Sequence, residues 1–149
     1  MPLTNRGLYR LLGIPFRAAT APANFYLALV TDASIATSIN VFSEVTEIAD
    51  TNGYTAGGIS VARNATDFDV WTEDDGNNRA YVQLKDMVWT ASGGPIPASG
   101  SGARNAILTD ANATQALREI WGAWDLTSAR VISDTQTLTL TNCEIRFAQ

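Results

Sequence analysis

Short segments with strand-like patterns occupy most of the chain after residue 24. Residues 24–31 read NFYLALVT, an almost continuous apolar run about as long as one strand. Residues 137–147 instead alternate between apolar and polar side chains. Alternation predicts a half-buried strand because successive side chains point to opposite faces, whereas a short apolar run predicts a strand buried on both faces. We therefore expect a mainly β chain that folds as a compact barrel or sandwich-like domain.

The clearest turn lies between two of these segments. Phe68 and Val70 alternate with aspartates, the acidic stretch 73–78 (EDDGNN) follows, and Val82 and Leu84 then resume the alternation. Glycine and asparagine between two alternating runs are typical of a β-hairpin. We also expect two short strands before it, beginning at residues 24 and 59.

The alternation near the C-terminus changes parity at one position. Leu138 and Leu140 occupy even positions, whereas Cys143, Ile145 and Phe147 occupy odd ones. Because a strand's side chains alternate with period two, an extra residue must lie between the two sets if both face one core. We expect a bulge or tight turn near Asn142.

A short helix is predicted at the N-terminus. Thr4 is suited to cap a helix, and leucines then recur at helical spacing up to Leu12. Gly13 and Pro15 are expected to end the helix after about two turns. Residues 17–23, rich in alanine and containing Pro22, are expected to form an extended connector.

Residues 111–124 predict one short internal helix. Its apolar residues recur at the spacing of one helix face: Leu117, Ile120, Trp121 and Trp124. Gly122 weakens the pattern because glycine disfavours a helix interior. Before this segment, residues 91–102 (ASGGPIPASGSG) carry no charge and almost no apolar side chain large enough to anchor them in a core. We expect a long loop there that is either mobile or held by a partner outside the domain.

Length and charge define the broad class of protein. The 149 residues, 46% of them apolar, are enough for one domain with a real core, so residues 1–149 are expected to form a single domain. The net charge is −5, with +3 before the first acid, Asp32, and −8 from Asp32 onward. An acidic body repels phosphate, so no nucleic-acid partner is expected. No apolar run is long enough for a membrane span or signal peptide, which predicts a protein that is made and kept inside a cell.

The residue types offer little for catalysis. The chain contains no histidine, the usual base and metal ligand, and Cys143 is expected to be a buried, inert thiol. The acids at 67–75 lack the spacing of a calcium loop, because Trp71 stands where the first aspartate should be. We therefore expect no enzymatic activity and no catalytic, cofactor or metal site. Four tryptophans, at positions 71, 89, 121 and 124, suit a core or interface, or a sugar-stacking platform.

Several stretches in order resemble small β-rich virion proteins of tailed bacteriophages. They are Leu8-Tyr9 in the first helix and residues 25–31, 45–49, 52–58 (NGYTAGG, the most distinctive piece), 84–92 and 103–108. Together they span nearly the full chain, and none is a catalytic motif. The group includes head-decoration proteins, so the resemblance implies a compact domain of the β-tulip type that assembles as a homotrimer. It also implies a place on the capsid exterior, where the protein binds the major capsid protein and stabilises the shell against packaged DNA.

The N-terminal segment, residues 1–23, is the candidate partner-binding arm. Its arginines suit an acidic shell or subunit, and its apolar side chains suit an interface. The candidate residues are Leu3, Arg6, Leu8, Tyr9, Arg10, Leu11, Leu12, Phe16 and Arg17. Alternatively, the helix packs on its own domain. A tail, neck or baseplate role and a carbohydrate-binding module for host attachment are the alternative functions.

Overall fold

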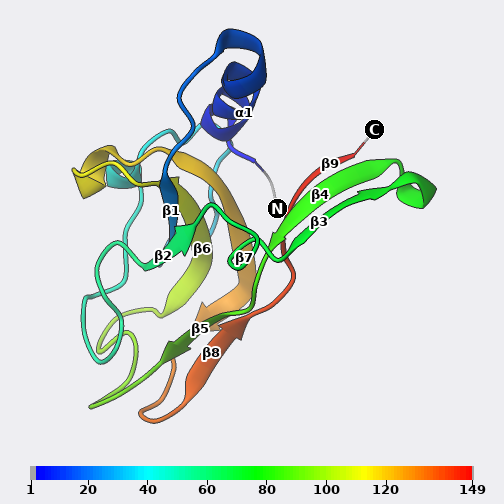
Figure 1. The fold of residues 1–149 in the computed structure, drawn as a ribbon. Helices are drawn as coiled ribbons and strands as arrows, with labels where there is room; N and C mark the ends of the chain where they lie inside the picture. Colours follow the sequence, from blue (N-terminus) through cyan, green and yellow to red (C-terminus); the bar gives the residue numbers. More distant parts are fainter. Residues whose placement is uncertain (1–2, 149) are drawn as a thin grey trace.

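The computed structural model describes residues 3–148, and these form one helix followed by a series of antiparallel strands (Figure 1). The mainly β fold predicted from the sequence is confirmed. The elements are α1 (Asn5–Arg17), β1 (Asn24–Val30), β2 (Ile59–Ala62), β3 (Val70–Asp74), β4 (Arg79–Leu84), β5 (Met87–Thr90), β6 (Ala103–Asp110), β7 (Ile120–Arg130), β8 (Thr137–Leu140) and β9 (Cys143–Ala148). Single 3-10 turns lie at Phe42–Glu44, Asp75–Asn77 and Gln115–Leu117.

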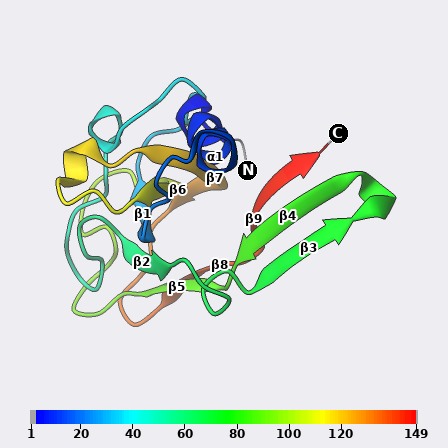
Figure 2. The same ribbon diagram turned by 45° about the horizontal axis from the view of Figure 1, so that its top comes forward.

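The strands form three open antiparallel sheets in a sandwich-like arrangement. A four-stranded sheet has the order β2-β1-β6-β7, a three-stranded sheet the order β3-β4-β9, and β5 pairs with β8. The β3-β4-β9 sheet extends away from the body, and its hairpin turn lies farthest from the four-stranded sheet (Figure 2). The helix α1 packs against β7.

The four-stranded sheet is buried on both faces. Leu27 and Leu29 of β1 pack into the main core, which also contains Trp89 of β5. Ala28 and Val30, which point the other way, pack with Phe42 in a second cluster beneath residues 35–45. Burial on both faces explains why residues 24–31 are apolar almost throughout, as the sequence predicted for a well-buried strand.

The predicted hairpin and the predicted C-terminal turn are both confirmed. β3 and β4 pair in register from Val70 opposite Gln83 to Asp74 opposite Arg79. Asn142 has a left-handed backbone, with φ of +55°, and separates β8 from β9. The two strands belong to different sheets, yet Leu138, Leu140 and Ile145 pack against the cluster that buries Cys143. The parity change therefore lets both sets of side chains reach one core.

The most distinctive stretch of the resemblance, residues 52–58, is a structural element. The buried Tyr54 hydroxyl donates to the Glu47 carboxylate at 2.7 Å and accepts from the Leu29 backbone N–H at 3.0 Å. Gly58 has φ of +80° and lies so close to β1 that a Cβ atom there would be 2.0 Å from the Leu27 carbonyl oxygen. The turn thus requires this tyrosine and this glycine to lie against β1.

The prediction of an internal helix at residues 111–124 is wrong. This part of the chain contains only the 3-10 turn Gln115–Leu117, and Ile120 begins the strand β7. Residues 120–123 are all buried because the sheet is covered on both faces, so the strand shows no alternation. A short apolar run of this kind has the same spacing as the buried face of a helix.

The loop at residues 91–102 is confirmed as a loop, but the expectation that it lacks an anchor in its own domain is wrong. Ile96 is only 1% exposed and exchanges two backbone hydrogen bonds with Ile132, of 2.9 and 2.8 Å. The backbone N–H groups of Gly93 and Gly94 both donate to the Asp134 carboxylate. One buried isoleucine and these hydrogen bonds hold the loop against the body.

The N-terminal helix is longer than predicted. Thr4 caps it as expected, with its hydroxyl accepting from the Gly7 N–H at 2.9 Å. The helix continues past Gly13 and Pro15 to Arg17, where Ala18 adopts a left-handed conformation and closes the helix with hydrogen bonding to the Gly13 carbonyl. Packing of Leu11 and Ile14 on the main core stabilises this last turn despite the proline.

Candidate functional site

Helix α1 is fixed to the start of β7 through its first turn. Leu3 forms an isolated bridge with Gly122, and the Thr4 N–H donates to the Trp121 carbonyl at 3.0 Å. Gly7 is buried against the same backbone, and a Cβ atom there would be 2.1 Å from the Trp121 carbonyl oxygen. Only glycine permits this approach, so residue 7 sets how closely the helix lies on the strand.

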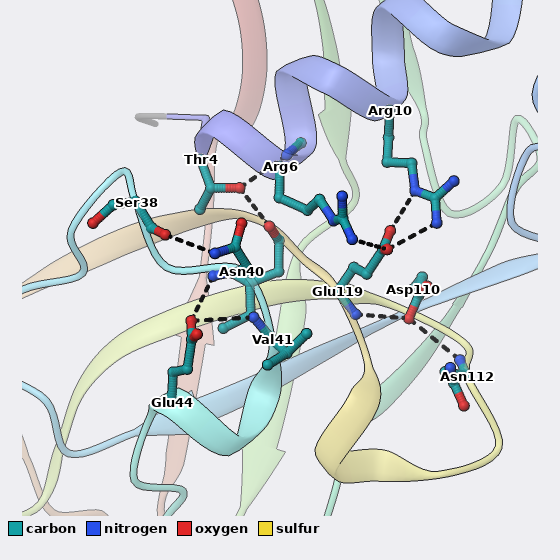
Figure 3. A network of polar contacts seen from close by, with 12 residues as sticks. Thr4, Arg6, Arg10, Ser38, Asn40, Val41, Glu44, Asp110, Asn112 and Glu119 are labelled. Atoms are coloured by element: carbon teal, nitrogen blue, oxygen red, sulfur yellow. Dashed lines mark hydrogen bonds and ion pairs between the residues drawn. The ribbon is translucent and has the colours of Figure 1, made fainter.

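Two arginines of α1 pair with one carboxylate of the body (Figure 3). Arg6 lies 3.0 Å from the Glu119 carboxylate, and Arg10 forms two hydrogen bonds with it. The hydrogen bond from Arg10 holds the pKa of Glu119 below its usual value, and the charges of both arginines act in the same direction. The Asp110 carboxylate accepts a hydrogen bond from the Glu119 backbone N–H at 3.0 Å, which helps to hold Glu119 in place.

The outer side of α1 carries an exposed apolar ridge. We define the α1 ridge as Leu8, Tyr9, Leu12 and Phe16, which are 37%, 64%, 58% and 76% exposed. Leu8, Leu12 and Phe16 follow one another every four residues and therefore lie on one side of the helix. Arg17 directly follows the ridge and is exposed.

Beside α1 lies an apolar groove of about 510 Å³. One wall comes from Leu11 and Ile14 of α1 and from the connector at Ala21 and Pro22. The floor includes Phe25, Phe68 and Trp121, whose rings pack edge to face. The opposite wall is the β3-β4-β9 sheet, which contributes Trp71, Ala80, Val82, Ile145 and Phe147. We call this space the apolar groove.

The pairing register explains why the sheet wall is apolar. Trp71, Val82 and Ile145 are aligned across the three strands, as are Glu73, Ala80 and Phe147 in the next row on the same face. Trp71 is 90% exposed and Phe147 is 51% exposed. The opposite face is polar and paired within itself, because Arg79 contacts both Asp74 and Glu144 there. The sheet is therefore amphipathic, with its apolar face toward the groove.

The structure divides the candidate partner-binding residues into three groups. Arg6, Arg10 and Leu3 bind the chain's own body, and Leu11 lines the groove. Leu8, Tyr9, Leu12, Phe16 and Arg17 remain exposed. Met1 and Pro2, at the start of the expected arm, lie outside the described residues. The helix thus packs on its own domain and still presents an apolar ridge.

Sequence reasoning missed the sheet wall of the groove. The sequence pattern predicts Trp71 only as a core, interface or sugar-stacking residue, and Phe147 only as an inward-facing residue of a C-terminal strand. The alternation within each strand does show which of its residues share a face. What it does not show is the pairing of β4 with β9, which joins residues some 65 positions apart into one face.

The other residues singled out for chemistry have structural surroundings. Cys143 is buried, as predicted, and burial raises its thiol pKa to about 11. Trp89 and Trp121 are each 3% exposed and are not available for stacking on a sugar. Within residues 3–148, no group of three or more acidic or cysteine side chains is placed to hold a metal ion.

Comparison with protein-family models, with curated proteins and with solved structures finds no match for this chain. Among the residues that the structure describes, no helix is both long and apolar enough to span a membrane.

Proposed function

We propose that this chain is a non-enzymatic structural protein of a tailed-bacteriophage particle, and specifically a head-decoration protein. It binds the capsid exterior as a homotrimer and stabilises the shell against the pressure of packaged DNA. The observation that carries the proposal is the presence of two exposed apolar surfaces, the α1 ridge and the apolar groove, on one small β domain. Contiguous apolar surface of this kind marks a site of protein association.

The character of both surfaces supports association rather than a reaction. The sheet wall of the groove is mostly aromatic and aliphatic, and the polar residues of the groove lining are Arg63, Asn64 and Tyr81. Exposed aromatic residues such as Trp71 and Phe16 are the type that contributes most of the energy of protein interfaces.

The resemblance to virion proteins supports the proposal that the chain belongs to a tailed-bacteriophage particle. Its most distinctive stretch, residues 52–58, packs a tyrosine and a glycine against β1 and takes part in folding. Proteins that share it would therefore share a scaffold, and the exposed surfaces would set the role of each. A tail, neck or baseplate position remains the closest alternative within the virion.

The direct test adds purified protein to expanded capsids that lack decoration. We expect saturable binding at a fixed ratio to the major capsid protein and a higher temperature of capsid disruption. Absence of binding to capsids, together with incorporation into tails or formation of polymers, would replace decoration by the tail alternative.

The exposed Trp71 favours one second candidate, a carbohydrate-binding module for host attachment. A glycan array would show binding that is lost on Trp71→Ala. Since Trp89 is buried, its replacement would act on the fold and is not an informative variant.

A further inference from the structure

We propose that Asp75, at the tip of the β3-β4 hairpin, is a site of spontaneous isoaspartate formation in the folded protein. The backbone nitrogen of Gly76 attacks the carboxyl carbon of the Asp75 side chain, and water leaves as a succinimide ring closes. Addition of water to the former main-chain carbonyl of that ring gives isoaspartate, in which the chain continues through the former side-chain carboxyl. One water leaves and one returns, so the mass is unchanged and no oxidant, reductant or cofactor takes part.

The turn at the hairpin tip leaves the reacting groups accessible. Asp75, Gly76 and Asn77 are all exposed, and this turn lies farthest from the four-stranded sheet (Figure 2). The hydrogen bond that closes the turn, from the Asn78 N–H to the Asp75 carbonyl oxygen, is long at 3.3 Å. An exposed tip of this kind opens locally at little cost in free energy. Opening lets the Gly76 nitrogen approach the carboxyl carbon of Asp75.

The two aspartates of the turn differ in how firmly they are held. The Asp74 carboxylate accepts hydrogen bonds from Arg79 at 2.7 Å and from the Asn77 side chain at 2.9 and 3.0 Å. None of the hydrogen bonds and ion pairs among residues 3–148 includes the Asp75 carboxylate. The Asp75 side chain is therefore free to rotate toward the nitrogen of the next residue, whereas the Asp74 side chain is not.

Gly76 favours the attack without being needed by the fold. Glycine lacks a Cβ atom, so its nitrogen is unshielded and its backbone adopts more conformations than that of any other residue. The backbone of Gly76 lies outside the left-handed region, and a Cβ atom there would meet only the Asp74 Oδ1 atom, at 3.7 Å. Alanine at this position thus changes the chemistry and leaves the structure as it is.

The chain's Asn-Gly pair, Asn52-Gly53, is protected by the fold. In an unfolded chain this pair reacts faster than Asp-Gly, because an uncharged amide accepts a nucleophile more readily than a carboxylate. In the folded protein the Asn52 side-chain N–H donates to the Pro95 carbonyl at 2.8 Å, and its backbone carbonyl accepts the Ser92 N–H at 2.8 Å. Gly53 is packed so closely that a Cβ atom would lie 2.4 Å from the Thr90 carbonyl oxygen. The folded structure therefore reverses the order of reactivity.

The experiment stores the folded protein at neutral pH and physiological temperature and then digests it with trypsin. Cleavage after arginine places Asp75 in the peptide 64–79 and Asn52 in the peptide 18–63. Electron-transfer fragmentation distinguishes isoaspartate from aspartate, and a gain in mass reports the conversion of an amide to an acid. We expect isoaspartate to accumulate at Asp75 with no change in mass, while the Asn52 amide persists.

Two variants and one change of solvent sharpen the result. Gly76→Ala should slow isoaspartate formation at least about tenfold and leave the free energy of unfolding nearly unchanged. Asp75→Asn should react faster than wild type at the same position, with loss of ammonia and a gain in mass. In guanidinium chloride, where the hydrogen bonds of Asn52 are lost, Asn52 should react faster than Asp75.

Three outcomes would overturn the assignment of Asp75. They are the absence of isoaspartate at Asp75 after storage, formation at the wild-type rate in Gly76→Ala, and faster reaction at Asn52 than at Asp75 in the folded protein.

Discussion

Gly7 of α1 lies directly on the backbone of Trp121 in β7, with room for a hydrogen atom but not for a methyl group. We expect Gly7→Ala to lower the free energy of unfolding by about 1–3 kcal/mol, because either the helix or the strand must shift. Urea denaturation measures the change. Gly13→Ala is the control in the same helix, since its Cβ would meet only the Ala19 methyl group at 3.4 Å. That variant should be neutral or more stable by up to about 1 kcal/mol, and equal losses in both would contradict the assigned contact.

Glu119 makes the attachment of α1 dependent on pH. Arg10 and Arg6 lower the pKa of this carboxyl in the folded state relative to the unfolded value of about 4.5. The stability it contributes is therefore complete above pH 4.5 and is lost as the pH falls through the lower folded pKa. We expect Glu119→Gln to reduce the thermal midpoint at pH 7 and to make little difference once the wild-type carboxyl is protonated.

The control for this pH dependence is Glu73→Gln, which removes an exposed carboxylate outside the ion pairs of the described residues. It should leave the thermal midpoint nearly unchanged at pH 7. A constant effect of Glu119→Gln across the acid range would show that the ion pair does not titrate as assigned.

Tyr54→Phe should lower the free energy of unfolding by about 1–3 kcal/mol, because it leaves the buried Leu29 N–H without its acceptor and removes a donor to Glu47. Tyr9→Phe makes the same chemical change at a side chain that is 64% exposed, and it should stay within about 0.5 kcal/mol of wild type. Denaturant titrations of the two variants measure the difference. Equal changes in the free energy of unfolding would contradict the role assigned to the Tyr54 hydroxyl.

Ile96→Ala tests whether the loop at residues 91–102 is anchored within the domain. Removing a fully buried isoleucine should cost about 2–5 kcal/mol of unfolding free energy. Val131→Ala, at an exposed position next to the bridge with Ile132, should cost less than about 0.5 kcal/mol. If Ile96→Ala left the free energy of unfolding unchanged, the loop would lack an anchor within the domain, as its composition predicts.

Cys143 should resist thiol reagents in the folded protein. Its burial raises the thiol pKa to about 11, so almost no thiolate exists at pH 8, and access is blocked as well. We expect one thiol to react with Ellman's reagent at once in guanidinium chloride and only slowly in its absence. Rapid modification without denaturant would mean that β9 opens readily.

The parts of the fold that the sequence predicted are those with local signals. The hairpin of β3 and β4 is specified by alternation on both sides of an acidic turn, and the turn at Asn142 by a change of parity. The internal helix failed because β7 is buried on both faces and loses its alternation. The prediction for the loop failed because the composition of residues 91–102 does not show that their single isoleucine, Ile96, is buried.

The candidate site was predictable to the same extent. The ridge lies on one helix, so its residues could be named from helical spacing alone. The groove depends on pairing between β4 and β9 and on where α1 rests relative to that sheet, and both are long-range contacts. The pairing of Arg6 and Arg10 with Glu119, rather than with a partner, is equally nonlocal.

The separation of β8 and β9 into different sheets has a practical consequence for handling the protein. Truncation after Asn142 would remove Ile145 and Phe147 and leave β3 and β4 as a lone hairpin, which is marginally stable in water. A purification tag or fluorescent reporter fused to the C-terminus would follow directly on β9, the strand that completes this sheet. Any tag placed at this end for binding studies should therefore be cleavable.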